Sequence, residues 1–254
     1  TPARYIWVPE LDGRGQGPLA RAASAMLKPL DRRRAAEPVA IAANSAFIAE
    51  RVGWAWDREA TVIHPPIDVA RFAQARATDE TEGVLATLPA DYLLGVSRFV
   101  PYKRLELVID AGVASGLPVV LAGGGADEAR LRAYADDRGH PVTIVRDPSS
   151  TLLAALYRAA VALVFPAVED FGIMPVEAMA TGTPVVGNAV GGVAESVVDG
   201  VTGALVHEWS TAELTAAVER AAAADRDACV RRAYEFDRPV FEAEIAAWVA
   251  REVG

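Results

Sequence analysis

The chain has 254 residues, of which 52% are hydrophobic and 23% charged, so it can form a packed core and is not expected to be disordered. Its formal net charge of -9 disfavours a general nucleic-acid binder, although a few basic side chains can still attract a small anion locally. The single cysteine, Cys229, excludes an intrachain disulfide and fits a reducing cytoplasm, and no apolar run reaches the ~18 residues of a membrane-spanning helix.

Short apolar runs alternate with longer amphipathic runs through the middle of the chain. This alternation predicts a doubly wound α/β domain with a parallel sheet, which binds ligands where its strands end, near the switch in strand order. A further strand over 39–43 has no strand partner before it, and an amphipathic helix is expected over 240–253. The expected strands are 92–96, 118–122, 142–145, 161–165, 184–186 and 204–206, and the expected helices are 102–115, 126–136, 152–160, 175–180, 193–198 and 211–224.

Three cations follow the first strand of this series. Arg98, Lys103 and Arg104 lie within seven residues in an otherwise acidic protein. Arginine can bind phosphate through two parallel hydrogen bonds, and lysine adds a compact positive charge. Positive charge at a helix start opposes the helix dipole, and a bound anion would resolve that conflict. The loop therefore indicates a phosphate or diphosphate site.

A second loop, after the strand at 161–165, contains Gly172 and leads into the helix predicted at Pro175. Gly172 allows close approach of a ligand to the backbone, and the N–H groups of residues 171–174 could point at an anion at the helix start. Glu169 and Glu177 flank this helix start, and their carboxylates are suited to accept hydrogen bonds from sugar or ribose hydroxyls.

These residues resemble a known family. Glu169 and Glu177, with seven residues between them, match the Glu-x7-Glu motif of retaining glycosyltransferases, and the stretch 169–178 is similar to glycosyltransferase family 4. The opening stretch 1–7 is similar to a subgroup that includes bacterial mannosyltransferases of polysaccharide synthesis. Further similar stretches are 43–45, 63–68, 182–186, 191–195 and 199–203.

The resemblance implies a GT-B architecture with the donor, a nucleoside-diphosphate sugar linked to GDP or UDP, bound in the second Rossmann-like domain. Arg98 and Lys103 would hold the diphosphate and stabilise it as it leaves, Glu169 would contact the donor sugar, and Glu177 would bind the ribose. The remaining donor-binding residues would be Gly123, Gly124, Phe171, Gly172, Ile173 and Met174. No cofactor or metal is expected, because two cations and a helix start can neutralise the diphosphate and no Asp-x-Asp motif lies near these loops.

The same resemblance predicts the domain organisation. Residues 1–43 would be the last part of an acceptor-binding domain that is otherwise missing, 44–70 an interdomain linker, 71–238 the donor-binding domain and 239–254 a crossover helix. The family's acceptor-side histidine has no counterpart that can be identified in the sequence. We therefore expect this chain to bind donor but to transfer poorly on its own.

The leading function is a cytoplasmic, metal-independent hexosyltransferase, with mannose from GDP-mannose favoured and a glycan, lipid-linked sugar or small molecule as acceptor. One alternative is an isolated donor-binding module without activity alone, and another is a GT-B sugar-nucleotide epimerase. The Arg32–Arg34 run is expected to be a solvated face, with contact to an anionic membrane surface as the less favoured alternative. A nicotinamide site at Gly123–Gly125 is disfavoured, because Glu128 occupies the place of the third glycine.

Overall fold

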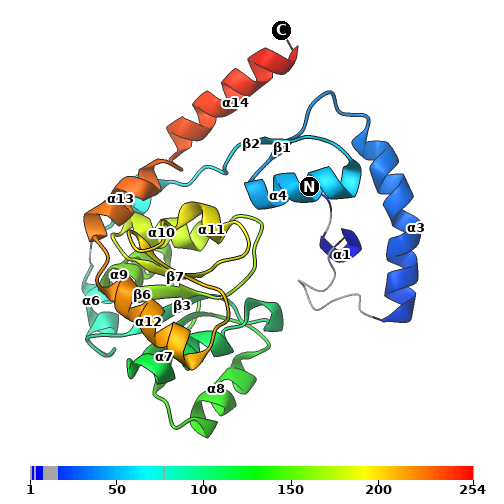
Figure 1. The fold of residues 1–254 in the computed structure, drawn as a ribbon. Helices are drawn as coiled ribbons and strands as arrows, with labels where there is room; N and C mark the ends of the chain where they lie inside the picture. Colours follow the sequence, from blue (N-terminus) through cyan, green and yellow to red (C-terminus); the bar gives the residue numbers. More distant parts are fainter. Residues whose placement is uncertain (1, 3, 8–16, 77, 254) are drawn as a thin grey trace.

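A parallel sheet with helices on both faces forms the main body of the chain (Figure 1). The computed structural model describes residues 2, 4–7, 17–76 and 78–253, and the sheet within them has six strands. The strands are β3 (Leu93–Arg98), β4 (Val119–Gly124), β5 (Val142–Val145), β6 (Ala162–Phe165), β7 (Val185–Asn188) and β8 (Gly203–Val206). The predicted α/β class is confirmed, and each strand lies within two residues of its expected place.

The strand order across the sheet is β5-β4-β3-β6-β7-β8, and every pair is parallel. The order reverses between β3 and β6, which are neighbours in the sheet although β4 and β5 lie between them in sequence. Such a switch point leaves a crevice at the carboxyl ends of the strands, because the following connections leave to opposite sides. The loops after β3 and β6, both singled out in the sequence, therefore meet at this crevice.

Apolar side chains pack on each face of the sheet. One cluster joins the sheet to α5, α9, α10 and α13, and the other joins it to α7, α8 and α12. These helices are α5 (Val69–Ala73), α7 (Glu106–Ser115), α8 (Glu128–Asp137), α9 (Ser150–Ala159), α10 (Ile173–Ala180), α12 (Thr211–Ala222) and α13 (Arg226–Tyr234), with two short helices, α6 (Asp79–Leu85) and α11 (Val193–Ser196), beside them.

The chain before the sheet forms a separate set of elements. They are α1 (Arg4–Trp7), α3 (Pro18–Ala35), β1 (Ala42–Ala43), α4 (Ala46–Trp56) and β2 (Thr61–Val62). The strand expected over 39–43 is shorter than predicted, and its parallel partner, β2, follows it in the chain. Residues 1 and 3 of the stretch 1–7, on which the subgroup resemblance rests, lie outside the described residues.

The last helix, α14 (Arg238–Val253), leads away from the sheet (Figure 1). It begins two residues before the predicted start at 240. The helix just before it, α13, is not predicted as a separate helix from the sequence. It buries only Cys229 and Ala233, so its apolar stripe is too narrow to give a clear helical pattern. Residues 44–70, expected as a linker, contain α4 and β2.

One predicted helix is wrong at its start. The helix expected over 102–115 is divided into a 3-10 turn, η1 (Pro101–Lys103), and α7, which begins at Glu106. Arg104 separates the two with a left-handed backbone, at φ 53°. The conflict between Lys103 and a helix dipole therefore does not exist, because Lys103 precedes α7 and Glu106 stands in that helix's first turn.

Candidate functional site

The loop after β3 presents two cations in different environments. Arg98 ends the strand with an exposed side chain, and its guanidinium donates to the Tyr102 hydroxyl at 3.3 Å. Lys103 is buried, at 8% exposure, and its ammonium lies 5.0 Å from the centre of the Tyr102 ring. The turn therefore brings one accessible and one sequestered positive charge to the carboxyl end of β3.

The sequestered charge has a partner from the other loop. The Lys103 ammonium forms an ion pair with the Glu169 carboxylate, and both side chains are largely buried, at 10% and 18% exposure. The two residues come from the loops after β3 and β6, which are adjacent strands at the switch point. The pairing of the predicted diphosphate-binding lysine with the predicted sugar-binding glutamate was not expected from the sequence.

Gly172 turns the second loop into α10. Its backbone adopts φ 90° and ψ 83°, a conformation that favours glycine, and α10 begins at the next residue, Ile173. Pro175 lies in the first turn as predicted, two residues inside the observed start. The first N–H groups of a helix have no intrahelical partner, and Gly172 has no side chain that could accept a hydrogen bond from those of Ile173 and Met174. An anion at this position would receive hydrogen bonds and favourable dipole energy.

Gly191 and Gly192 support the loop that follows β6. The N–H of Gly192 donates to the Glu169 carbonyl at 2.9 Å. A methyl group added to Gly192 would lie 2.2 Å from the Cα of Phe171, and one added to Gly191 would lie 2.8 Å from the Glu169 carbonyl oxygen. The glycine pair therefore allows the backbone at 191–192 to support the backbone at 169–171 in direct contact.

Two cavities meet at these loops. The first, of about 390 Å³, lies over the ends of β3, β4 and β5, and the second, of about 440 Å³, lies over the loop after β6 and reaches Asn44 and Pro65. Lys103 and Met174 line both cavities. Arg98, Gly123 and Gly124 line the first, whereas Glu169, Phe171, Gly172 and Ile173 line the second. The structure thus brings nine of the ten predicted site residues into one continuous region.

Glu177 is the tenth predicted residue, and it lies below this region. Its carboxylate accepts a hydrogen bond from the Tyr157 hydroxyl at 3.2 Å. Burial raises its pKa above the ordinary value, and this effect outweighs the Tyr157 bond and the nearby Arg71 charge, which both lower it. In the described part of the chain, Glu177 does not line either cavity. It follows Met174, which lines both cavities, by three residues on α10, and so lies one helical turn away from it.

The glycine run after β4 has a packing reason of its own. Ser97 pairs with Gly123 across the sheet, and Phe99 donates its N–H to the Gly124 carbonyl at 2.8 Å. A methyl group on Gly123 would lie 2.0 Å from the Ser97 carbonyl oxygen, and one on Gly125 would lie 2.5 Å from that of Phe99. These glycines let the two loops run in contact and leave bare backbone along the first cavity.

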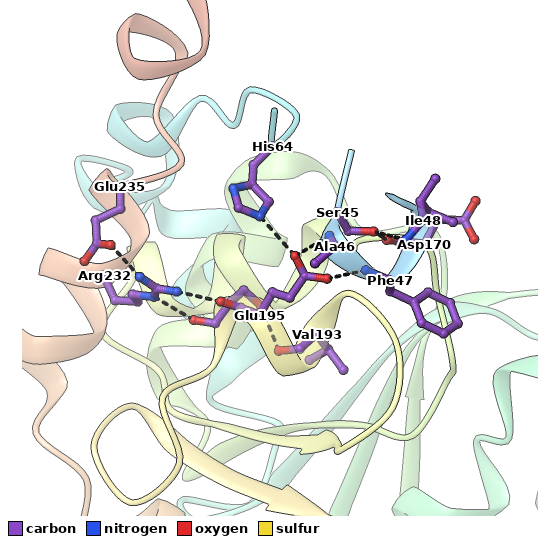
Figure 2. A network of polar contacts seen from close by, with 11 residues as sticks. Ser45, Ala46, Phe47, Ile48, His64, Asp170, Val193, Glu195, Arg232 and Glu235 are labelled. Carbon is purple, nitrogen blue, oxygen red and sulfur yellow. Dashed lines mark hydrogen bonds and ion pairs between the residues drawn. The ribbon is translucent and has the colours of Figure 1, made fainter. Parts of the chain in front are cut away.

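Residues far away in sequence brace the loop that follows β6 (Figure 2). The Ser45 hydroxyl, which caps α4, donates to the Asp170 carbonyl at 2.5 Å, and Arg51 forms a 3.3 Å ion pair with the Asp170 carboxylate. His64 packs against Phe171 with ring centres 5.4 Å apart, and against Phe236 at 5.2 Å. The position of the loop therefore depends on residues that precede the sheet.

Glu195 is the centre of the polar network in Figure 2. Its carboxylate accepts hydrogen bonds from the backbone N–H groups of Ala46 at 2.8 Å and Phe47 at 2.9 Å, and it contacts His64 Nε2 at 3.2 Å. Burial alone would raise the pKa of Glu195, but the bonds from His64, Phe47 and Ala46 together lower it. The network ties α11 to the first turn of α4.

Sequence reasoning missed this bracing. Ser45, His64 and Glu195 fell in stretches quoted for the resemblance, yet each was separated from its partner by more than a hundred residues, and nothing in the sequence connected them. The cap signal at Ser45 before an apolar run was visible but was assigned to a linker. The contacts of His64 with two aromatic rings are those of a side chain that packs the loop in place.

Within the part of the chain that the structure describes, no three His, Cys, Asp or Glu side chains gather in a group that could hold a metal ion. None of the described helices combines the length and the apolar character that crossing a membrane requires.

The chain is similar to proteins of known kind. It is 38% identical over 169 residues to D-inositol 3-phosphate glycosyltransferase from Mycobacterium tuberculosis and Mycobacterium bovis, in a match that covers 59% of this chain and 34% of the relative. The chain therefore spans about a third of the length of the curated relatives it matches.

Solved structures share the fold. Sucrose-phosphate synthase from Thermosynechococcus elongatus superposes with a TM-score of 0.77 at 22% identity, covering 95% of this chain and 65% of the other. Anabaena HepE in complex with UDP and glucose gives a TM-score of 0.71 at 21% identity, covering 84% and 63%.

The family model described as glycosyl transferases group 1 matches residues 82–236, which include the sheet, both cavities' sheet-side walls and the Glu169–Glu177 helix start. That match extends over more than half of the chain, so the protein belongs to the group 1 glycosyltransferases.

Proposed function

We propose that this chain carries the donor site of a retaining glycosyltransferase that transfers a hexosyl group, with mannose favoured, from a nucleoside-diphosphate sugar. The acceptor would be a glycan, a lipid-linked sugar or a small molecule. The observation that supports this proposal best is the position of Lys103, whose ammonium lies at the junction of the two cavities. A diphosphate at that junction would place the nucleoside in one cavity and the sugar in the other.

The charges at the junction suit a leaving diphosphate. Arg98 offers an exposed guanidinium, Lys103 an ammonium, and the start of α10 the N–H groups of Ile173 and Met174. Fixed donors of this kind stabilise charge that develops as the bond to the sugar breaks, and they need no reorganisation at that moment. No metal is required by this arrangement, because the donors themselves neutralise the diphosphate.

Two carboxylates would bind the hydroxyl groups of the donor. Glu169 lines the second cavity and would accept hydrogen bonds from the donor sugar hydroxyls, with the backbone at 171–174 beside it. A bound diphosphate would compete with Glu169 for Lys103, and the carboxylate would then be free to turn to the sugar. Glu177 would accept the ribose hydroxyls from beneath the wall at Met174.

Titration calorimetry with GDP, UDP and ADP and their sugars tests the donor site. Arg98→Ala and Lys103→Ala should each weaken nucleotide binding by about 10- to 100-fold, since each removes charge-assisted hydrogen bonds to phosphate. Arg220→Ala is the matched control, because Arg220 is exposed and pairs with Asp199 away from both cavities. Unchanged affinity in both site variants would refute the proposal.

Slow donor hydrolysis tests the reaction itself. Proton NMR of the first sugar released from a nucleotide sugar should show the anomer of the donor, as retention requires. Release of the opposite anomer first would contradict a retaining mechanism while leaving the donor site in place.

A further inference from the structure

A carboxylate stands at the end of the first cavity opposite to the cations. Asp147 follows β5 and lines this cavity together with Pro148 and Leu153. It is exposed, and in the described part of the chain its carboxylate makes neither a hydrogen bond nor an ion pair. The neighbouring Arg146 guanidinium donates its hydrogen bonds to Glu128 and not to Asp147, with Nε 3.0 Å from Oε2. A negative group with open hydrogen-bonding capacity therefore faces the cavity.

The backbone holds Asp147 in this position. Its φ of 42° lies in the left-handed region, which Asp and Asn enter at lower cost than most residues. The carboxylate lies above bare backbone, since a methyl group added to Gly124 would be 3.5 Å from Oδ1 and 4.0 Å from Oδ2. The carboxylate therefore lies beside the glycine backbone at the end of β4.

The sheet fixes the order of groups along the site. The four strands β5, β4, β3 and β6 are consecutive in the sheet. Asp147 follows β5, and Gly123 and Gly124 lie at the end of β4. Arg98 ends β3, Lys103 comes shortly after it, and Glu169 follows β6. Neighbouring strands are ~4.8 Å apart, so the ends of β5 and β3 are separated by ~10 Å. A nucleotide sugar has the same linear order of base, ribose, diphosphate and sugar. The base therefore falls at Asp147 when the diphosphate is at Lys103.

The chemistry at Asp147 discriminates between bases. Guanine carries two adjacent donors, N1–H and the 2-amino group, which match the two oxygens of a carboxylate. Adenine presents one amino donor beside an acceptor nitrogen, and uracil presents one N–H between two carbonyl oxygens, so both would set an acceptor against the carboxylate. Pro148 and Leu153 provide apolar contact near the ring.

We infer that Asp147 reads the base of the donor, and that the donor of this chain is a guanosine-diphosphate sugar. This inference rests on the proposed function, because it assumes that the diphosphate occupies the junction at Lys103. A rival role for the same carboxylate is to accept the ribose hydroxyls, which all nucleotides share, and the test separates the two.

The experiment measures the affinities of GDP, inosine diphosphate, UDP and ADP for the chain and for Asp147→Asn. Inosine diphosphate differs from GDP only in lacking the 2-amino group. Asparagine adopts the left-handed conformation at least as readily as aspartate, so the variant should keep its fold, which circular dichroism checks. Asp137→Asn, at a side chain 84% exposed on α8, is the matched control.

The inference expects GDP to bind most tightly, inosine diphosphate more weakly, and UDP and ADP weakest. Asp147→Asn should weaken GDP by about 5- to 150-fold, reduce the advantage of GDP over inosine diphosphate, and leave UDP almost unchanged. An equal loss for all four nucleotides would assign Asp147 to the ribose and overturn base reading. If UDP bound the unmodified chain as tightly as GDP, base reading would be overturned but the donor site would not. If no nucleotide bound, the proposed function itself would be refuted.

Discussion

Lys103 and Glu169 form an ion pair across the switch point of the sheet, between the loop after β3 and the loop after β6. Both side chains are mostly shielded from solvent, so neither charge is well hydrated when its partner is removed. In the absence of ligand this pair neutralises the two charges that we assign to the diphosphate and to the sugar.

Removing one member of the pair should cost more than removing both. Lys103→Met leaves the Glu169 carboxylate without its counter-charge, and we expect the free energy of unfolding to fall by about 1–3 kcal/mol. Glu169→Gln should cost less, and the double variant should be more stable than the sum of the single changes predicts. Urea unfolding of the four proteins measures this coupling, and strict additivity would contradict a direct ion pair.

The same pair predicts opposite effects on two ligands. Glu169→Gln removes the negative charge that competes for Lys103, so GDP without its sugar should bind more tightly than to the unmodified chain. The nucleotide sugar should gain less or lose affinity, since the carboxylate that we assign to its hydroxyls is gone. Calorimetry with both ligands measures the difference, and an equal change for both would contradict the assignment of Glu169 to the sugar.

Glu177 should make folding stability depend on pH. Burial raises its pKa in the folded state, so its favourable contribution is fully present below the ordinary value of 4.5 and is lost as pH rises through the folded-state pKa. Glu177→Gln cannot ionise, so its stability relative to the unmodified chain should increase between pH 4 and pH 8. Glu219→Gln is the matched control for the loss of one carboxylate, because Glu219 is exposed on α12. Unfolding midpoints across this pH range decide the matter.

Glu195 should hold the first turn of α4. Glu195→Ala removes the acceptor for the Ala46 and Phe47 N–H groups, and we expect a loss of about 1–2 kcal/mol. Because the pKa of Glu195 is lowered in the folded state, its contribution is present above the ordinary pKa and is lost as pH falls through the lowered value. Hydrogen exchange should accelerate at these two amides and not in the sheet.

A matched control for Glu195 lies in α12, the helix that follows the neighbouring strand β8. Glu213 accepts hydrogen bonds from the His207 N–H at 2.8 Å and the Glu208 N–H at 2.7 Å, in the same bidentate manner. Glu213→Ala should lower stability by a similar amount but leave exchange at Ala46 and Phe47 unchanged. If both variants accelerated exchange at α4 equally, Glu195 would contribute only to overall stability and not specifically to the first turn of α4.

Gly192→Ala should displace the loop that carries Glu169. The added methyl would meet the Phe171 Cα at 2.2 Å and the Asp170 carbonyl oxygen at 2.6 Å, which are backbone atoms that cannot rotate aside. We expect a loss of about 1–3 kcal/mol together with weaker binding of the nucleotide sugar. Gly83→Ala, on α6 with no atom within 4 Å of the added methyl, should instead be neutral or stabilise by up to about 1 kcal/mol. Wild-type binding by Gly192→Ala would contradict the support role.

The alternation of apolar runs was enough to predict the sheet and the loops that matter, because each buried strand and each amphipathic helix has its own period. The 3-10 turn at Pro101–Lys103 could not be predicted in the same way, since its geometry depends on the left-handed Arg104 and on tertiary contacts. The pairing of Lys103 with Glu169 needed the strand order, which places β3 beside β6. The contacts of Ser45 and Glu195 needed the full chain path, because their partners are more than a hundred residues away.

The junction between α4 and the sheet is bridged by polar contacts, and among the described residues the apolar cluster around Ile48 and Val52 is separate from the two clusters on the sheet. Hydrogen bonds and ion pairs at such a junction can be re-formed at a new angle more easily than interlocked apolar side chains can. Over many generations a lineage could therefore exchange or reorient the segment before the sheet without rebuilding the interior of the sheet.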